Sequence, residues 1–183
     1  MVDENRYNAV PYHFNDELVK FISQHPEYVS KITPWIDRLT PEWSVQTWEI
    51  SHFLQRIGGL SPIISTLIGR GDETSLAKAA YSLDAFGQAD IKTCMEIIRR
   101  TDNENTISHI DGLLYSTEVV MGEYGIAESY ESKAKTLSTY LNDPSDRVKK
   151  YAKRMVESFE ASAKSERQRT EEGKQLRKLD FEG

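Results

Sequence analysis

Histidine and cysteine are the residue types in this chain best suited to catalysis or metal binding, but their spacing gives little support for either. The chain has four histidines and one cysteine. His109 has an acid close by in the sequence, Asp111. On a helix, positions i and i+2 diverge, so this pair does not make a base oriented by a carboxylate. No HExxH pattern supplies the paired histidines that a zinc hydrolase needs.

A packed thiol and a helix turn are the predicted roles of two further features. Cys94 lies on an apolar stripe with Ile91, Met95 and Ile98, which predicts a buried side chain rather than a nucleophile. A lone cysteine also excludes an intramolecular disulfide. The segment GRGDET, residues 69–74, lacks the GK[ST] of a phosphate-binding loop, so it is predicted to end one helix and cap the next. We expect no catalytic residue, no metal and no cofactor.

Tryptophans are the first candidates for partner binding. Trp35, Trp43 and Trp48 are crowded into the N-terminal third of the chain. Such side chains either fill the interfaces between helices or anchor a bound protein segment, because tryptophan is enriched among the residues that dominate interface energies. Core packing is the expected role, and Trp43 and Trp48 are retained as candidate partner-binding residues.

The placement of proline and glycine and the spacing of the apolar residues indicate an all-α chain. Five of the six prolines follow a residue suited to a helix N-cap or turn, and proline is tolerated at the first helical position. Asp143, for example, is expected to cap a helix whose first residue is Pro144. Apolar residues then recur three and four apart, the period of an amphipathic helix. The predicted helices span residues 14–24, 26–38, 41–57, 61–69, 73–86, 89–100, 104–122, 126–142 and 144–178.

One apolar pattern occurs three times, with steps of 34 and 38 residues. The matched trios are Leu76, Ala80 and Leu83; Ile110, Leu114 and Thr117; and Val148, Ala152 and Met155. Another predicted helix separates each trio from the next. A helix pair repeated every ~30–45 residues is typical of an α-solenoid, in which each pair buries its apolar face against its neighbours. An irregular helical bundle is the alternative.

Two segments carry a resemblance to HEAT-like repeats. LNDPSDRVKKYAKRMVESF, residues 141–159, has a short Asp/Pro turn before a helix with Val, Ala and Met on one face, and GRGDETSLAKAAYSLDAFG, residues 69–87, is similar to it. The likeness covers residues 67–160, and residues 14–66 follow only the rhythm of helices. It implies a right-handed stack of antiparallel helix pairs, here with a long C-terminal helix. The predicted organisation is a helical-repeat domain, 1–160, and a charged, helix-prone tail, 161–183.

The resemblance also places a set of basic residues. In HEAT-like stacks the second helix of each pair generally lines the concave face. The basic residues expected on that face are Lys92, Arg99, Arg100, Lys133 and Lys135. On an otherwise acidic body, such a strip is predicted to attract an acidic partner segment. Ordinary solvated side chains are the simpler alternative.

Charge and hydropathy narrow the class of function. Residues 1–144 carry 12 Lys/Arg against 21 Asp/Glu, which argues against a general nucleic-acid binder. No stretch approaches the ~20 apolar residues of a membrane span. The N-terminus has no secretory pattern, and a single cysteine suits a reducing cytoplasm.

The prediction is therefore a cytoplasmic, non-enzymatic module for protein interaction, acting as a scaffold or sensor, either alone or within a larger assembly. One alternative is a small regulator or inhibitor of a specific enzyme. The other follows from the resemblance, because a few HEAT-like proteins are DNA-repair glycosylases. In that case Trp43 or Trp48 with a nearby aspartate would do the chemistry.

Overall fold

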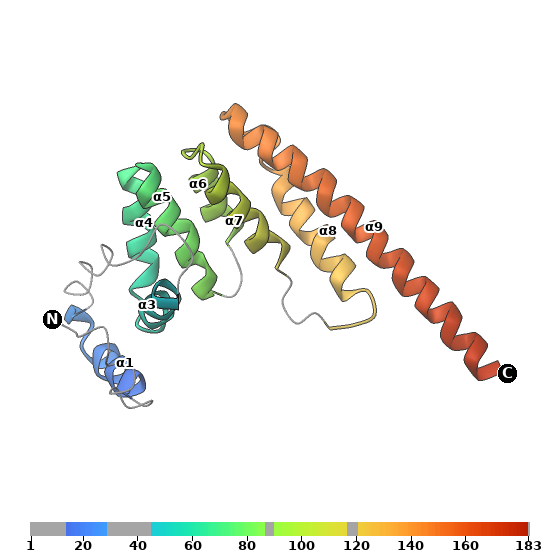
Figure 1. The fold of residues 1–183 in the computed structure, drawn as a ribbon, viewed down its shortest axis with the longest axis horizontal. Coiled ribbons are helices and arrows are strands. Elements are labelled where there is room, and N and C mark those ends of the chain that lie inside the picture. Colours follow the sequence, from blue (N-terminus) through green and yellow to red (C-terminus); the bar gives the residue numbers. More distant parts are fainter. Residues whose placement is uncertain (1–13, 29–44, 87–89, 117–120, 183) are drawn as a thin grey trace. The chain divides into compact units, whose positions relative to one another are not determined.

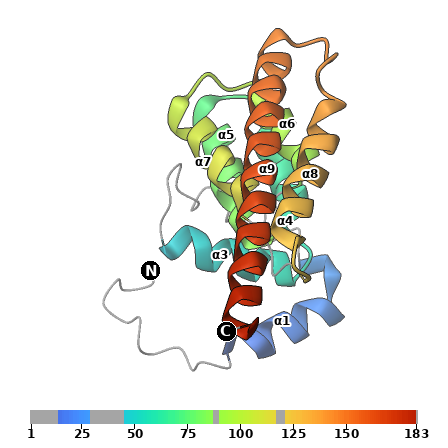
Figure 2. The ribbon, with the colours of Figure 1, turned by 90° about the vertical axis from the view of Figure 1, so that its right-hand side faces the viewer.

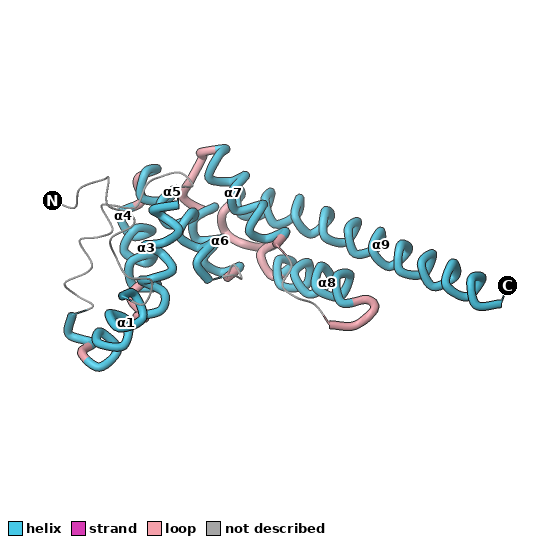
Figure 3. The backbone as a smooth tube through the Cα atoms, turned by 60° about the horizontal axis from the view of Figure 1, so that its bottom comes forward, coloured by secondary structure: helices cyan, strands magenta, loops and turns pink. Residues whose placement is uncertain are grey.

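The computed structural model describes residues 14–28, 45–86, 90–116 and 121–182, and every regular element in these ranges is helical (Figures 1 and 3). The all-α prediction is confirmed. No helix in the described ranges is long and apolar enough to cross a membrane. The elements are α1 (Phe14–Gln24), η1 (Pro26–Tyr28), α3 (Val45–Arg56), α4 (Leu60–Arg70), α5 (Glu73–Ser82), η3 (Leu83–Phe86), α6 (Ile91–Ile98), α7 (Glu104–Tyr115), α8 (Gly125–Ser138) and α9 (Asp146–Glu182).

The chain forms two compact units, Met1–Phe86 and Gly87–Gly183. In the first unit, α3, α4, α5 and η3 pack around buried side chains that include Leu54, Leu67 and Leu76. The predicted helix 73–86 corresponds to α5 followed by η3. The predicted domain 1–160 spans both units, and the predicted tail 161–183 belongs to the second.

The turn between α4 and α5 shows how local sequence sets this packing. Gly71 ends α4 with φ of 74°, in the left-handed region that favours glycine. Asp72 then caps α5, because its carboxylate accepts a hydrogen bond from the Ser75 amide at 2.9 Å. The predicted sequence of C-cap, turn and N-cap in GRGDET is confirmed.

The second unit consists of α6, α7, α8 and α9, and α9 lies along α8 (Figures 1 and 2). Asp90 caps α6, and Asn103 caps α7. Its core combines α6, α7, α8 and the first half of α9, with Met95, Ile110, Leu137 and Phe159 among the fully buried side chains.

The start of α9 differs from the prediction. Asp143 does not cap the helix, and Pro144 is not its first residue, since α9 begins at Asp146. Ser145 takes the cap position instead, because its hydroxyl oxygen accepts a hydrogen bond from the Val148 amide at 3.5 Å. Asp143 accepts the Ser145 amide at 2.9 Å and the Arg99 guanidinium at 2.7 Å. An ion pair with a residue 44 positions away therefore holds the aspartate in the preceding turn.

The bounds of other helices also differ from the prediction. α7 ends at Tyr115, seven residues before the predicted end at 122, with Ser116 as its C-cap. The predicted helix 26–38 begins as the short η1, and most of it lies outside the described residues. α9 continues through the predicted tail to Glu182, four residues beyond the predicted end at 178.

Candidate partner-binding surfaces

Trp48 is an exposed aromatic side chain on α3, a helix that also contributes buried residues to the core of the first unit. Its side chain is 46% exposed, whereas Leu54 on the same helix is 0% exposed. At 3.6 residues per turn, Trp48 lies about 120° around the helix from Leu54. It therefore falls outside the buried stripe, and the expectation that it packs in the core is wrong. Trp43, the other candidate, lies outside the described residues, as does Trp35.

A histidine one turn later completes this surface. The rings of Trp48 and His52 lie 4.2 Å apart between centroids, with planes inclined at 52°. Positions i and i+4 share one face of a helix, so the two rings lie side by side on one surface of α3. The pair thus offers a broad apolar face beside a ring nitrogen able to form hydrogen bonds.

A second aromatic group occurs on α1, which contacts α3. Phe21 is 48% exposed. Its ring lies 4.6 Å from that of His25 and 5.6 Å from that of Tyr28. Sequence reasoning did not select Phe21. Its signal was available, because an aromatic residue four positions before a histidine is the same spacing as Trp48 and His52.

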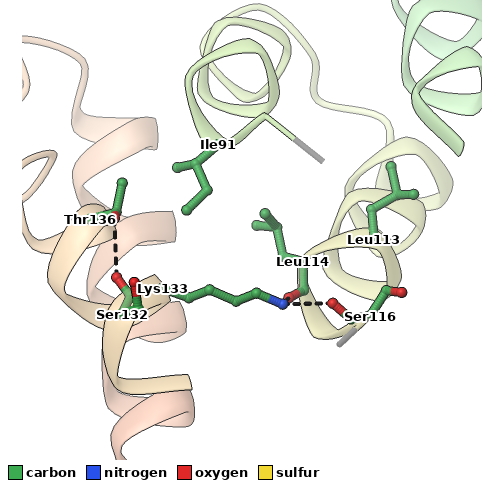
Figure 4. Close-up of a pocket in the computed structure, with 7 residues that line it drawn as sticks. All are labelled: Ile91, Leu113, Leu114, Ser116, Ser132, Lys133 and Thr136. Atoms are coloured by element: carbon green, nitrogen blue, oxygen red, sulfur yellow. Dashed lines mark hydrogen bonds between the residues drawn. The ribbon is translucent and has the colours of Figure 1, made fainter. Parts of the chain in front are cut away.

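Among the predicted basic residues, Lys133 is directed into the second unit rather than toward solvent (Figure 4). Its ammonium donates hydrogen bonds to the carbonyl oxygens of Leu114 at 2.7 Å and Ser116 at 2.6 Å. These carbonyls end α7, where the helix dipole favours a positive charge. Lys133 also borders a cavity of about 140 Å³ between α6, α7 and α8. In the structure, Lys133 therefore supplies hydrogen-bond donors to the carbonyl groups at the C-terminal end of α7.

The other predicted basic residues belong to two different elements. Lys92, Arg99 and Arg100 belong to α6 and the turn after it, whereas Lys135 is exposed in the last turn of α8. Arg99 is engaged in the ion pair with Asp143 described above. The hydrogen bond from the Ser145 amide, followed by that from Arg99, lowers the pKa of Asp143.

Sequence reasoning missed a polar network that joins α7 to α9. Asp111 accepts two hydrogen bonds from Arg154, at 2.9 and 3.0 Å, and one from the Tyr151 hydroxyl at 2.7 Å. Burial and the Asp111 carboxylate raise the pKa of Tyr151. The partners are 40 and 43 residues apart, so no local pattern announces the network. It is suited to fixing α7 against α9.

Comparison of the chain with protein families, curated proteins and solved structures found no match. Within the described ranges, no group of three or more His, Cys, Asp or Glu side chains is placed to hold a metal ion. The exposed aromatic pair of Trp48 and His52 is the candidate binding surface that the exposure and ring geometry define.

Proposed function

We propose that this chain is a HEAT-like helical-repeat protein that acts as a non-enzymatic protein-binding module. The observation that carries the proposal is the half-exposed Trp48, supported by His52 on a helix whose other side is buried. A rigid aromatic side chain on a packed helix can bury a large area at low entropic cost, which is the property of an interface anchor.

The repeat assignment is supported by how consecutive helices connect. α4 and α5 are joined by the two residues Gly71 and Asp72. α6 and α7 are joined by residues 99–103, and α8 and α9 by residues 139–145. Short connections between consecutive packed helices occur in α-solenoids, both within a helix pair and from one pair to the next. Helical bundles also have short connections, so the 34- and 38-residue steps of the apolar pattern are what favours a repeat origin, and Thr117 of the middle trio lies outside the described residues.

The partner we propose is a protein segment with an apolar side chain that packs against the Trp48 indole. The Phe21 ring on α1 provides a second apolar contact in the same unit. The basic residues predicted from sequence have a smaller part in this proposal, because Lys133 and Arg99 bind groups of the second unit itself.

The test compares two substitutions of exposed apolar residues. Trp48→Ala removes the proposed anchor, and Leu141→Ala is the control, since Leu141 is 37% exposed and belongs to the other unit. Both variants should keep the far-UV circular dichroism of the wild type. In affinity capture followed by titration of the recovered protein, Trp48→Ala should weaken binding at least about tenfold, and the control less than about twofold. Equal binding by wild type and Trp48→Ala, or no reproducible partner for the wild type, would contradict the proposal.

A further inference from the structure

The attachment of α9 changes in character part-way along its length. Between Val148 and Ala163, its inward side chains are almost fully buried. The buried residues are Val148, Tyr151, Ala152, Met155, Val156, Phe159 and Ala163. From Lys164 to Arg177, by contrast, no side chain is buried. We call these the proximal and distal segments of α9. Apolar burial holds the proximal segment, so something else must hold the distal one.

Charged groups make the distal contact. Arg167 donates two hydrogen bonds to the Glu131 carboxylate, at 2.7 and 2.8 Å. Lys174 lies 3.0 Å from the Glu123 carboxylate. The ring of Tyr124 lies between these two cations, 5.3 Å from the Arg167 guanidinium and 4.2 Å from the Lys174 ammonium. We define these five residues as the distal latch.

Further polar contacts extend the latch without adding apolar burial. Arg177 reaches Glu123 at 3.4 Å, and Glu171 accepts a hydrogen bond from the Tyr124 hydroxyl. The buried residues of α8 between Tyr124 and Glu131 are Gly125 and Ala127, which offer one methyl group between them. The distal segment therefore has little apolar surface to dock against.

The helix of the distal segment is also weak by itself. Gly173 stands near its middle, and glycine inside a helix is less favourable than alanine. The distal segment extends a helix that the proximal segment already nucleates, but each added residue gains little in water, so its order depends on docking. Exposed ion pairs provide that docking, and the stabilisation from such pairs is small and screened by salt.

We propose that the distal segment of α9 is an arm that undergoes an order–disorder transition, closed by the distal latch and opened by ionic strength while the proximal segment stays folded. Salt screens the exposed charges that hold the arm, whereas it does not weaken the apolar burial that holds the proximal segment. Opening exposes Tyr124 and the face of α8 beneath the arm. Such local unfolding is independent of global unfolding.

Hydrogen exchange of the full-length protein, followed by mass spectrometry, tests the proposal. Exchange is measured at about 0.01 M and about 1 M sodium chloride, between which the Debye length falls from about 30 to about 3 Å. Amides of residues 165–177 should exchange at least about fivefold faster at high salt, as expected from screening several exposed pairs. Amides of residues 149–160 should change less than about twofold. Equal salt responses in the two segments would overturn the proposal.

A pair of neutral substitutions tests the latch itself. Glu123→Gln combined with Glu131→Gln removes both carboxylates and preserves side-chain size. At low salt this variant should exchange its distal amides as fast as the wild type does at high salt, with proximal exchange unchanged. Glu157→Gln is the matched control, because Glu157 pairs with Lys153 of the same helix at 4.0 Å. If the double variant keeps wild-type distal protection at low salt, the latch does not hold the arm.

Discussion

Truncation of Phe159 should show most clearly how much of the stability of the second unit comes from its apolar core rather than from the ion pairs at its surface. The side chain is 0% exposed, and its ring is stacked on Tyr130 at 5.6 Å and tilted against Tyr115 at 4.9 Å. Truncation of a buried phenylalanine to alanine costs about 3–5 kcal/mol. Each aromatic contact accounts for about 0.5–1.5 kcal/mol beyond area burial, so a value of about 4 kcal/mol is expected.

Urea unfolding followed by circular dichroism at 222 nm measures this cost. With a slope of about 2 kcal/mol per molar urea, Phe159→Ala should lower the midpoint of the second unit by about 2 M. Phe159→Leu keeps most of the volume and should cost about 1–2 kcal/mol. Leu176→Ala is the control, because Leu176 is 63% exposed and should change stability by less than about 0.5 kcal/mol. A cost below about 1 kcal/mol for Phe159→Ala would refute the assignment of this ring to the core.

Two further predictions concern titratable groups. Because the Ser145 amide and Arg99 lower the pKa of Asp143 below its ordinary 3.8, its contribution to stability is complete above that value and is lost as pH falls through the lower folded-state pKa. Asp143→Asn should therefore flatten the fall in Tm that the wild type shows between about pH 5 and about pH 2, and an unchanged acid limb would argue against the ion pair. Burial raises the pKa of Cys94 to about 12, so the native thiol should resist a disulfide reagent at about pH 8 and react only after unfolding. Reaction of the native protein within seconds would show that the thiol is accessible.

Helix content and the caps of several helices could be predicted because they depend on neighbours in the sequence. The helix after Asp72 starts where expected. Its cap needs only a carboxylate that accepts a hydrogen bond from the backbone amide three residues later. α9 was also expected, although its start lies two residues later than predicted. There a tertiary contact between Asp143 and Arg99 replaced the local one.

The polar contacts between helices could not be predicted, because their partners are far apart in the sequence. Arg167 and Glu131 are 36 residues apart, and nothing in the local pattern distinguishes Arg167 from Arg169, which is exposed. Trp48 was misassigned for a related reason. Its apolar character predicts burial, but burial depends on the helix face, and that face is set by the position of Leu54 and its neighbours.

Because α9 is one uninterrupted helix, the distance between two positions along it reports whether the helix is intact. At a rise of 1.5 Å per residue, spin labels at positions 150 and 177 are separated by about 40 Å when the helix is intact. A narrow distance distribution reports a straight rod, and a broad one reports its melting. A protein domain attached near residue 177 would accordingly be held at a fixed distance from the core of the second unit in dilute buffer. By the proposed opening of the arm, it would be on a flexible tether in concentrated salt.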